Sequence, residues 1–156
     1  RCLWSPTAVY VAFRCPYTQL TVFAPVSKTE RLGLWDRDVV EVFLGPDPDR
    51  IGRYGEYEDA PTNERLDVLI DRPNKDFDWD SRFTSAVKID EARHLWTAEL
   101  RIPFASLAAT PPTPGTRWRM NLYRNDRAGD VFLAWSPTLT PTAHTPEKFG
   151  TLLFGR

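Results

Sequence analysis

The chain has 156 residues, of which 42% are apolar, and this is enough for one domain with a sizeable core. Twenty basic and 21 acidic residues leave a formal net charge of −1, so bulk charge does not attract nucleic acid or an anionic membrane. The longest apolar runs have the length of strands, and none would span a bilayer. Because the first residue is Arg1 and not a methionine, we expect a fragment in which an export signal would not be visible.

Short segments of alternating or apolar residues, separated by turn signals about every ten residues, predict an all-β chain. In chain order, the expected strands cover residues 3–4, 9–14, 39–44, 53–59, 65–70, 83–89, 95–102, 117–125, 131–135 and 149–154. About ten such strands indicate an antiparallel sandwich or a barrel with little helix. Residues 103–107 are expected to form one helical turn, with Pro103 in its first position.

The only two cysteines, Cys2 and Cys15, lie in the first expected hairpin. The turn at residues 5–8 places Cys2 opposite Val11, which leaves Cys15 on the order of 10 Å beyond the reach of a disulfide. We therefore expect two free thiols packed as small apolar groups. No CxxC or HExxH motif occurs, so the sequence predicts no structural zinc.

The strand at 39–44 contains the most informative residue, Glu41. Val40 and Val42 lie on one face of this strand. Glu41 lies on the other face, between the large apolar side chains of Val39 and Phe43. A partly desolvated carboxylate of this kind can accept hydrogen bonds from sugar hydroxyls. The alternative is a structural ion pair between Glu41 and an arginine.

Tryptophans at the ends of strands are candidate partners for that carboxylate. Trp35 lies just before the Glu41 strand and Trp135 lies at the end of another strand, where an indole can cover the apolar face of a pyranose. The alternative is that each caps the core. Trp79 is expected to be exposed, either as a third contact for the ligand or as a residue that holds its loop, whereas Trp96 and Trp118 share strand faces with apolar residues and are expected in the core.

The strand at 117–125 presents a polar face opposite Trp118. That face carries Arg119, Asn121, Tyr123 and Asn125. It could line a site for a polyhydroxy ligand, or it could be a solvated sheet face, and the pattern alone leaves both open.

Six segments, 10–14, 35–44, 57–63, 96–104, 118–124 and 134–150, resemble in order the family 9 carbohydrate-binding modules and their relatives in the DOMON-like superfamily. The resemblance spans nearly the whole chain, although members usually begin with an extra segment that this chain lacks. It implies one β-sandwich domain over residues 1–156 that binds a glucose- or xylose-type saccharide and catalyses nothing itself. It further implies a monomeric, extracellular or periplasmic module that accompanies a glycoside hydrolase.

In the family, two tryptophans clamp a sugar ring, and their positions are similar to those of Trp35 and Trp135 here. A glutamate six residues after the first tryptophan binds hydroxyls, and Glu41 has that spacing. Glu58 and Ala60 stand where the family has an arginine and an asparagine. The candidate ligand-binding residues are Trp35, Glu41, Trp135, Glu58, Asn63, Asn121, Tyr123 and Arg124.

No cofactor is expected, apart from the structural calcium that related modules carry. Two acidic loops could supply its oxygen ligands, and their candidates are Asp47, Asp49, Asp76, Asp78 and Asp80. The alternative explanation for these aspartates is turn formation.

Two other functions remain open at this stage. A glycosidase would pair Glu41 with Glu56 or Glu58 as its two carboxylates. A haem-binding electron-transfer domain of DOMON type would draw its axial ligands from His94, His144 and Met120.

Overall fold

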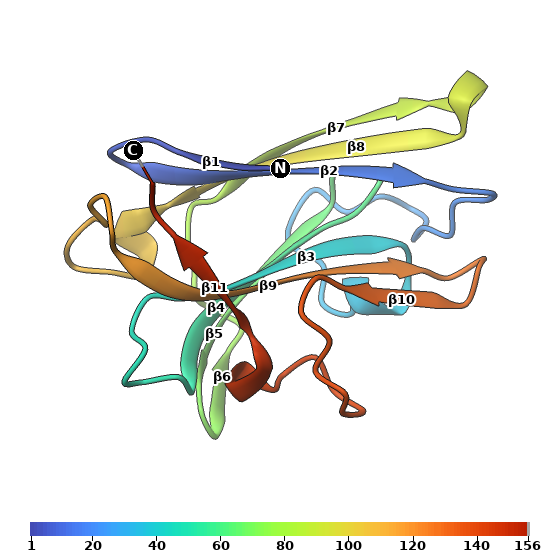
Figure 1. Ribbon diagram of the computed structural model, residues 1–156. Coiled ribbons are helices and arrows are strands. Elements are labelled where there is room, and N and C mark those ends of the chain that lie inside the picture. The colour runs from blue at the N-terminus through green and yellow to red at the C-terminus, as the bar shows by residue number, and fades with distance from the viewer. Residues whose placement is uncertain (156) are drawn as a thin grey trace.

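The computed structural model describes residues 1–155, which form two antiparallel β-sheets stacked as a sandwich (Figure 1). The small sheet has the order β1-β2-β8-β7, with bounds Cys2–Trp4, Ala8–Pro16, Leu95–Pro103 and Thr84–Asp90. The large sheet has the order β10-β9-β3-β4-β5-β6, and β11 also pairs with β9. Its bounds are Val131–Ala134, Arg117–Asp126, Val39–Gly45, Arg53–Asp59, Arg65–Asp71, Asn74–Asp76 and, for β11, Gly150–Leu153. The predicted fold class is confirmed.

The predicted hairpins are confirmed in their pairing. Cys2 lies opposite Val11, both cysteines are free, and Cys15 lies opposite Trp96 on the neighbouring strand β8. The short strand β6 was not expected, because Asn74–Asp76 has neither apolar nor alternating character. The turn expected at 103–107 is the 3₁₀ turn Phe104–Ser106, and three more such turns lie at Leu34–Asp36, Glu91–Arg93 and Pro146–Lys148.

The main core lies between the two sheets. Val40, Val42 and Leu44 of β3 face Trp96 and other apolar residues of the small sheet. Trp118, Phe104 and Phe154 meet edge to face at one end of this core, as aromatic rings prefer. The core assignments of Trp96 and Trp118 are confirmed. Among residues 1–155, no helix is long and apolar enough to cross a membrane.

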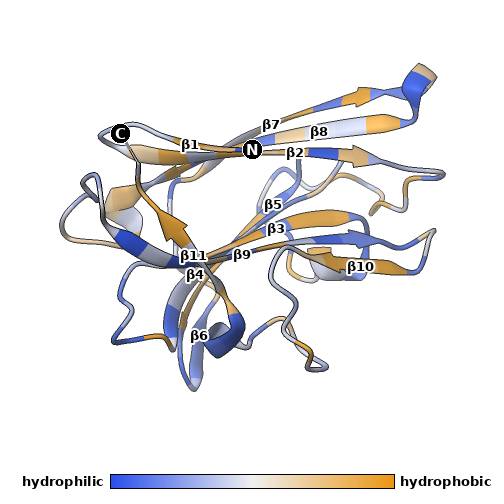
Figure 2. Ribbon diagram, viewed as in Figure 1, coloured by the Kyte–Doolittle hydropathy of each residue, from blue (hydrophilic) through white to orange (hydrophobic). Residues whose placement is uncertain are grey.

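The outer face of the large sheet is also covered, which the alternation of β3 did not predict. Every residue of β3 is buried, and Figure 2 shows the strand as largely apolar. Val39 and Phe43 pack in a second apolar cluster with Tyr54 and Tyr123, beneath long loops that contribute Phe23 and other residues. Glu41 therefore lies inside a second layer of packing and not on a solvated surface.

Candidate functional site

A cavity of about 560 Å³ opens on the outer face of the large sheet, within that second layer. Its floor comes from three neighbouring strands, through Glu41 of β3, Glu56 of β4 and Asn125 of β9. Glu41 reaches this face because Val40 and Val42 on either side of it point into the main core. The size falls within the range of ligand pockets in proteins.

Two buried carboxyl groups, those of Glu41 and Glu56, lie in this floor, and a third, that of Glu58, lies beside them in the sheet. Glu58 lies directly opposite Glu41 in the β3–β4 ladder, and Glu56 lies on the same face two residues away. Burial raises the pKa of all three, and the charges of neighbouring members raise the pKa of Glu41 and Glu58 further. The opposing charges of Arg127, near Glu41, and Lys75, near the other two, only partly offset this rise. Near neutral pH the cluster therefore holds more protons than free glutamates would, and it is only partly ionised.

Exposed aromatic rings form the walls. Trp35, 36% exposed, lies in the 3₁₀ turn before β3, and Asn125 Nδ2 and an Arg127 guanidinium nitrogen donate to its carbonyl oxygen at 3.0 and 2.8 Å. Phe132 of β10, 51% exposed, stacks on Tyr123 with ring centroids 5.3 Å apart. Phe77 supplies a third exposed ring. Apolar faces beside hydrogen-bonding groups are what a pyranose ring requires.

The remaining wall is residues 140–144, which a hydrogen-bond chain holds in place. Lys75 Nζ lies 2.7 Å from His144 Nε2, and Tyr54 Oη lies 2.9 Å from His144 Nδ1. An ammonium can only donate, so Nε2 accepts and Nδ1 carries the proton that it donates to Tyr54. Burial and the charges of Lys75 and Arg72 lower the pKa of His144 to about 4, so this ring is neutral near pH 7.

Asn121 and Tyr123 anchor the same loop from below. Asn121 Oδ1 accepts from the Ser136 amide at 2.9 Å, and its Nδ2 donates to the Ser136 carbonyl at 2.7 Å and to Tyr123 Oη at 2.6 Å. Tyr123 Oη in turn donates to the Ala143 carbonyl at 2.9 Å. The polar face expected on this strand therefore positions the cavity wall, and of its residues Asn125 itself lines the cavity.

The structure brings together five of the eight residues expected to bind a ligand. Trp35 and Glu41 line the cavity, while Glu58, Asn121 and Tyr123 support it from the sheet. Sequence reasoning did not place Lys75, Phe77, Arg127 and Phe132 at the site, and it considered Glu56 and His144 only for the alternative functions.

The structure does not bring Trp135 to Trp35. The Trp135 ring packs over Gly150, where an added Cβ would lie 2.5 Å from it, and Gly150 pairs with Met120 of the main core. Trp135 therefore lies on the side of the large sheet opposite Glu41. Phe132, and not Trp135, supplies the second aromatic ring of the cavity. It pairs with Asn125, and residues 132 and 134 both face the outer side of the large sheet. Counting this alternation from the predicted hairpin could have found Phe132.

Arg124 and Asn63 also lie away from the cavity. Arg124 pairs with Val40, whose side chain points into the main core, and it donates to the Pro16 carbonyl and to Asp126. Asn63 lies in the β4–β5 turn and accepts from Ser85. Trp79, which was expected to be exposed, is half-buried against Tyr57 at 5.9 Å and fastens its loop.

The structure places the candidate haem ligands in different parts of the fold and the candidate carboxylates together. Met120 lies in the main core, His94 ends the turn before β8, and His144 lines the cavity on the outer face of the large sheet. An axial pair from these three residues therefore finds no support in the geometry. The three glutamates named for a glycosidase do share one face.

Three of the aspartates that were considered as calcium ligands stabilise turns instead. Asp47, Asp76 and Asp80 each accept from a backbone amide two residues ahead, at 2.8 to 3.0 Å. Among residues 1–155, no group of three histidine, cysteine or acidic side chains could hold a metal ion. A structural calcium ion therefore stays a prediction, and we derive no role for it.

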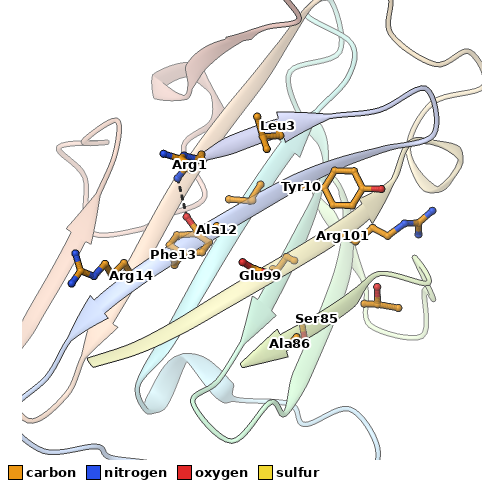
Figure 3. A pocket seen from close by; sticks show the side chains of 13 residues that line it. Arg1, Leu3, Tyr10, Ala12, Phe13, Arg14, Ser85, Ala86, Glu99 and Arg101 are labelled. Carbon is orange, nitrogen blue, oxygen red and sulfur yellow. Dashed lines mark hydrogen bonds between the residues drawn. The ribbon is translucent and has the colours of Figure 1, made fainter. Parts of the chain in front are cut away.

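A second hollow, of about 810 Å³, lies on the outer face of the small sheet. Figure 3 shows its side chains, among them Tyr10, Glu99 and Arg101, standing along nearly flat strands. Tyr10 is its one exposed aromatic ring, and no buried carboxyl lies in its lining as described over residues 1–155. We therefore place the candidate site at the cavity of the large sheet.

The fold and this cavity define a β-sandwich with a pocket suited to a small polar ligand. The profile of the family described as carbohydrate family 9 binding domain-like matches residues 1–155, and the chain belongs to that family. The crystal structure of a candidate carbohydrate-binding protein from Bacteroides uniformis has the same fold, with a TM-score of 0.81 at 19% identity. The match covers 99% of this chain and 76% of that one.

Two curated relatives match this chain over only part of their own length. An extracellular protein of Arthroderma benhamiae is 23% identical over 139 residues, which cover 78% of this chain and 62% of the relative. Endo-1,4-beta-xylanase A of Thermotoga maritima is 26% identical over 158 residues, which cover 97% of this chain and 13% of the xylanase. The chain thus spans less than two thirds of either relative.

Proposed function

We propose that this domain binds a saccharide, without catalysis, in the cavity on the outer face of the large sheet. The single observation that carries the proposal is the placement of Trp35 and Phe132 as exposed rings around the carboxyl groups of Glu41 and Glu56. Membership of a carbohydrate-binding family supports it.

In the proposed mode, a pyranose of glucose or xylose type rests its apolar face on Trp35, with Phe132 at its other side. Glu41, Glu56 and Asn125 exchange hydrogen bonds with its hydroxyls. Protonated carboxyls can donate as well as accept, which suits a hydroxyl in either role. Each bond contributes only about 1 kcal/mol net, because the sugar gives up water to form it. A one-ring site should bind with a Kd of roughly 10 μM to 1 mM.

Replacing Trp35 with alanine should raise the Kd for the sugar by about tenfold or more, because stacking area and water exclusion are both lost. The matched control is Trp135→Ala, which removes a tryptophan that is 54% exposed on the other side of the sheet. Calorimetric titration with cellobiose and xylobiose measures both. Equal affinity in Trp35→Ala and the unmodified domain, or loss in Trp135→Ala alone, would place the sugar elsewhere.

Binding without hydrolysis is part of the proposal. The pure domain should release no chromophore from an aryl glucoside or xyloside in an overnight assay. A slow release that disappears in the Glu41→Gln variant would favour a glycosidase with Glu41 as one of its carboxylates.

We further propose that the domain works outside the cytoplasm, as a binding module attached to or acting beside a glycoside hydrolase. The support is that one relative is described as an extracellular protein and another as an endo-xylanase of which the matched segment is a small part.

A further inference from the structure

Glu41 and Glu56 in the cavity floor, and Glu58 beside them, have no cation bound to them among the described residues. Glu41 Oε1 has only the Asn125 amide, at 3.5 Å, and neither oxygen of Glu58 has a hydrogen-bond partner. Glu56 lies 3.8 Å from His144 Nε2, but His144 is neutral near pH 7. All three side chains are nine-tenths or more buried.

The two cations that line the cavity are held elsewhere. Lys75 donates to His144 at 2.7 Å, and Arg127 donates to the Trp35 carbonyl and lies 3.7 Å from Asp36. Neither comes within 4 Å of a carboxyl oxygen of the cluster in residues 1–155. The cavity therefore contains buried acid groups from two adjacent strands and lacks a direct counter-ion for them.

Buried carboxyl groups in proteins are paired with a cation, bind a metal or keep their protons. The described residues provide no metal site. What the cavity does provide, around Glu41 and Glu56, is three exposed aromatic rings, whose faces attract an organic cation as well as a sugar ring. An aromatic wall over an acidic floor matches a ligand that combines an apolar ring face with a positive charge.

Resting on the proposed function, we propose that the preferred ligand of this site is an amino sugar, a pyranose with a free protonated amine directed at Glu41 and Glu56. The ammonium supplies three donors to carboxyl oxygens that no protein cation contacts, and the ring keeps its place on Trp35. Acetylation of the amine would remove the charge and enlarge the group. Neutral sugars would bind, but without the charge-assisted bonds.

The same arrangement predicts a pH dependence of its own. The charged groups facing the amine would be Glu41, Glu56 and Glu58, with Lys75 and Arg127 at the rim and His144 neutral. The pKa of each glutamate is raised, so acidification fills the cluster with protons and weakens its attraction for a cation. Affinity for an amino sugar should fall from pH 7 to pH 5, whereas affinity for glucose should change little.

The test is calorimetric titration of the intact domain at pH 7 with glucosamine, its isomers with the amine at carbon three or carbon six, glucose and N-acetylglucosamine. At least one amino sugar should bind roughly tenfold more tightly than glucose and N-acetylglucosamine. Ethanolamine, a bare ammonium without a ring, should bind much more weakly than that amino sugar. Glu56→Gln should abolish the preference for the amino sugar, while Glu99→Gln on the outer face of the small sheet should leave both the preference and glucose binding unchanged.

Each other outcome is decisive. If glucose binds as tightly as every amino sugar, the amino-sugar inference is overturned and saccharide binding stands. If ethanolamine binds as tightly as the best amino sugar, the site recognises only the ammonium group and the inference fails. If the preference survives in Glu56→Gln, the acid floor is not its cause. If no sugar binds, the proposed function falls together with the inference.

Discussion

At the scale of single residues, the buried acids govern how this domain responds to pH. Glu58 is fully buried, its carboxyl oxygens lack hydrogen-bond partners, and burial with two like-charged neighbours raises its pKa well above the usual value. In the unfolded chain a glutamate titrates near a pKa of about 4.3. Between these two pKa values, the folded state holds a proton that the unfolded state releases. The contribution of Glu58 to stability is therefore complete at low pH and is lost as the pH rises.

Glu58→Gln should remove this dependence because the amide is uncharged and nearly the same shape. We expect the variant to gain about 1 to 3 kcal/mol in free energy of unfolding at pH 8 and to match the unmodified domain near pH 4. Urea unfolding at the two pH values measures this difference. If the variant is destabilised by the same amount at both pH values, Glu58 makes a stabilising hydrogen bond that does not depend on pH, and the prediction is wrong.

At the scale of elements, the loop over the cavity is fixed by one strand. Asn121 in β9 makes hydrogen bonds to both backbone groups of Ser136 and to Tyr123, and it is fully buried. Asn121→Ala leaves these groups without partners, so the free energy of unfolding should fall by about 2 to 4 kcal/mol. Amide exchange at residues 136–144 should accelerate and saccharide affinity should fall. Unchanged exchange there would mean that other contacts hold the loop.

The pairing of β11 with β9 depends on one glycine beside a tryptophan. A Cβ at position 150 would lie 2.5 Å from the Trp135 ring, so Gly150→Ala should destabilise the domain by about 1 to 3 kcal/mol. In the double variant with Trp135→Ala the loss should be largely recovered, since the ring that the methyl group meets is gone. Thermal unfolding of the three variants measures the coupling. If the stability losses of the two single variants add in the double variant, the Trp135 ring is not the source of the strain. Saccharide binding should be unaffected in all three variants.

Sequence patterns predicted the strands well because alternation and turns are local properties. The register of Cys2 against Val11 and the burial of Trp96 and Trp118 follow from such local signals. The apolar cluster on the outer face of the large sheet does not follow from local signals. Whether the face that carries Glu41 is exposed to solvent depends on loops that are distant in the sequence. Trp135 was misplaced for a different reason, because a strand-end tryptophan resembles a pocket wall until the alternation of its own hairpin is counted.

At the scale of the whole molecule, the two faces of the large sheet have different roles in the fold. The inner face packs against the small sheet and holds the fold together, and the outer face carries the loops and the cavity. This arrangement lets the acid groups of β3 and β4 be buried without disturbing the main core. It also separates Trp35 and Trp135, the two half-exposed tryptophans named for binding, onto opposite sides of one sheet.

That separation permits a direct test of where the saccharide binds. Each of the six tryptophans gives one indole N–H signal in a two-dimensional NMR spectrum of the labelled domain, and single substitutions assign them. Titration with the best-binding saccharide should shift the Trp35 signal progressively and leave the Trp135 signal in place. A shift of Trp135 with Trp35 unchanged, or changes confined to residues around Tyr10 on the small sheet, would contradict a saccharide site over Glu41.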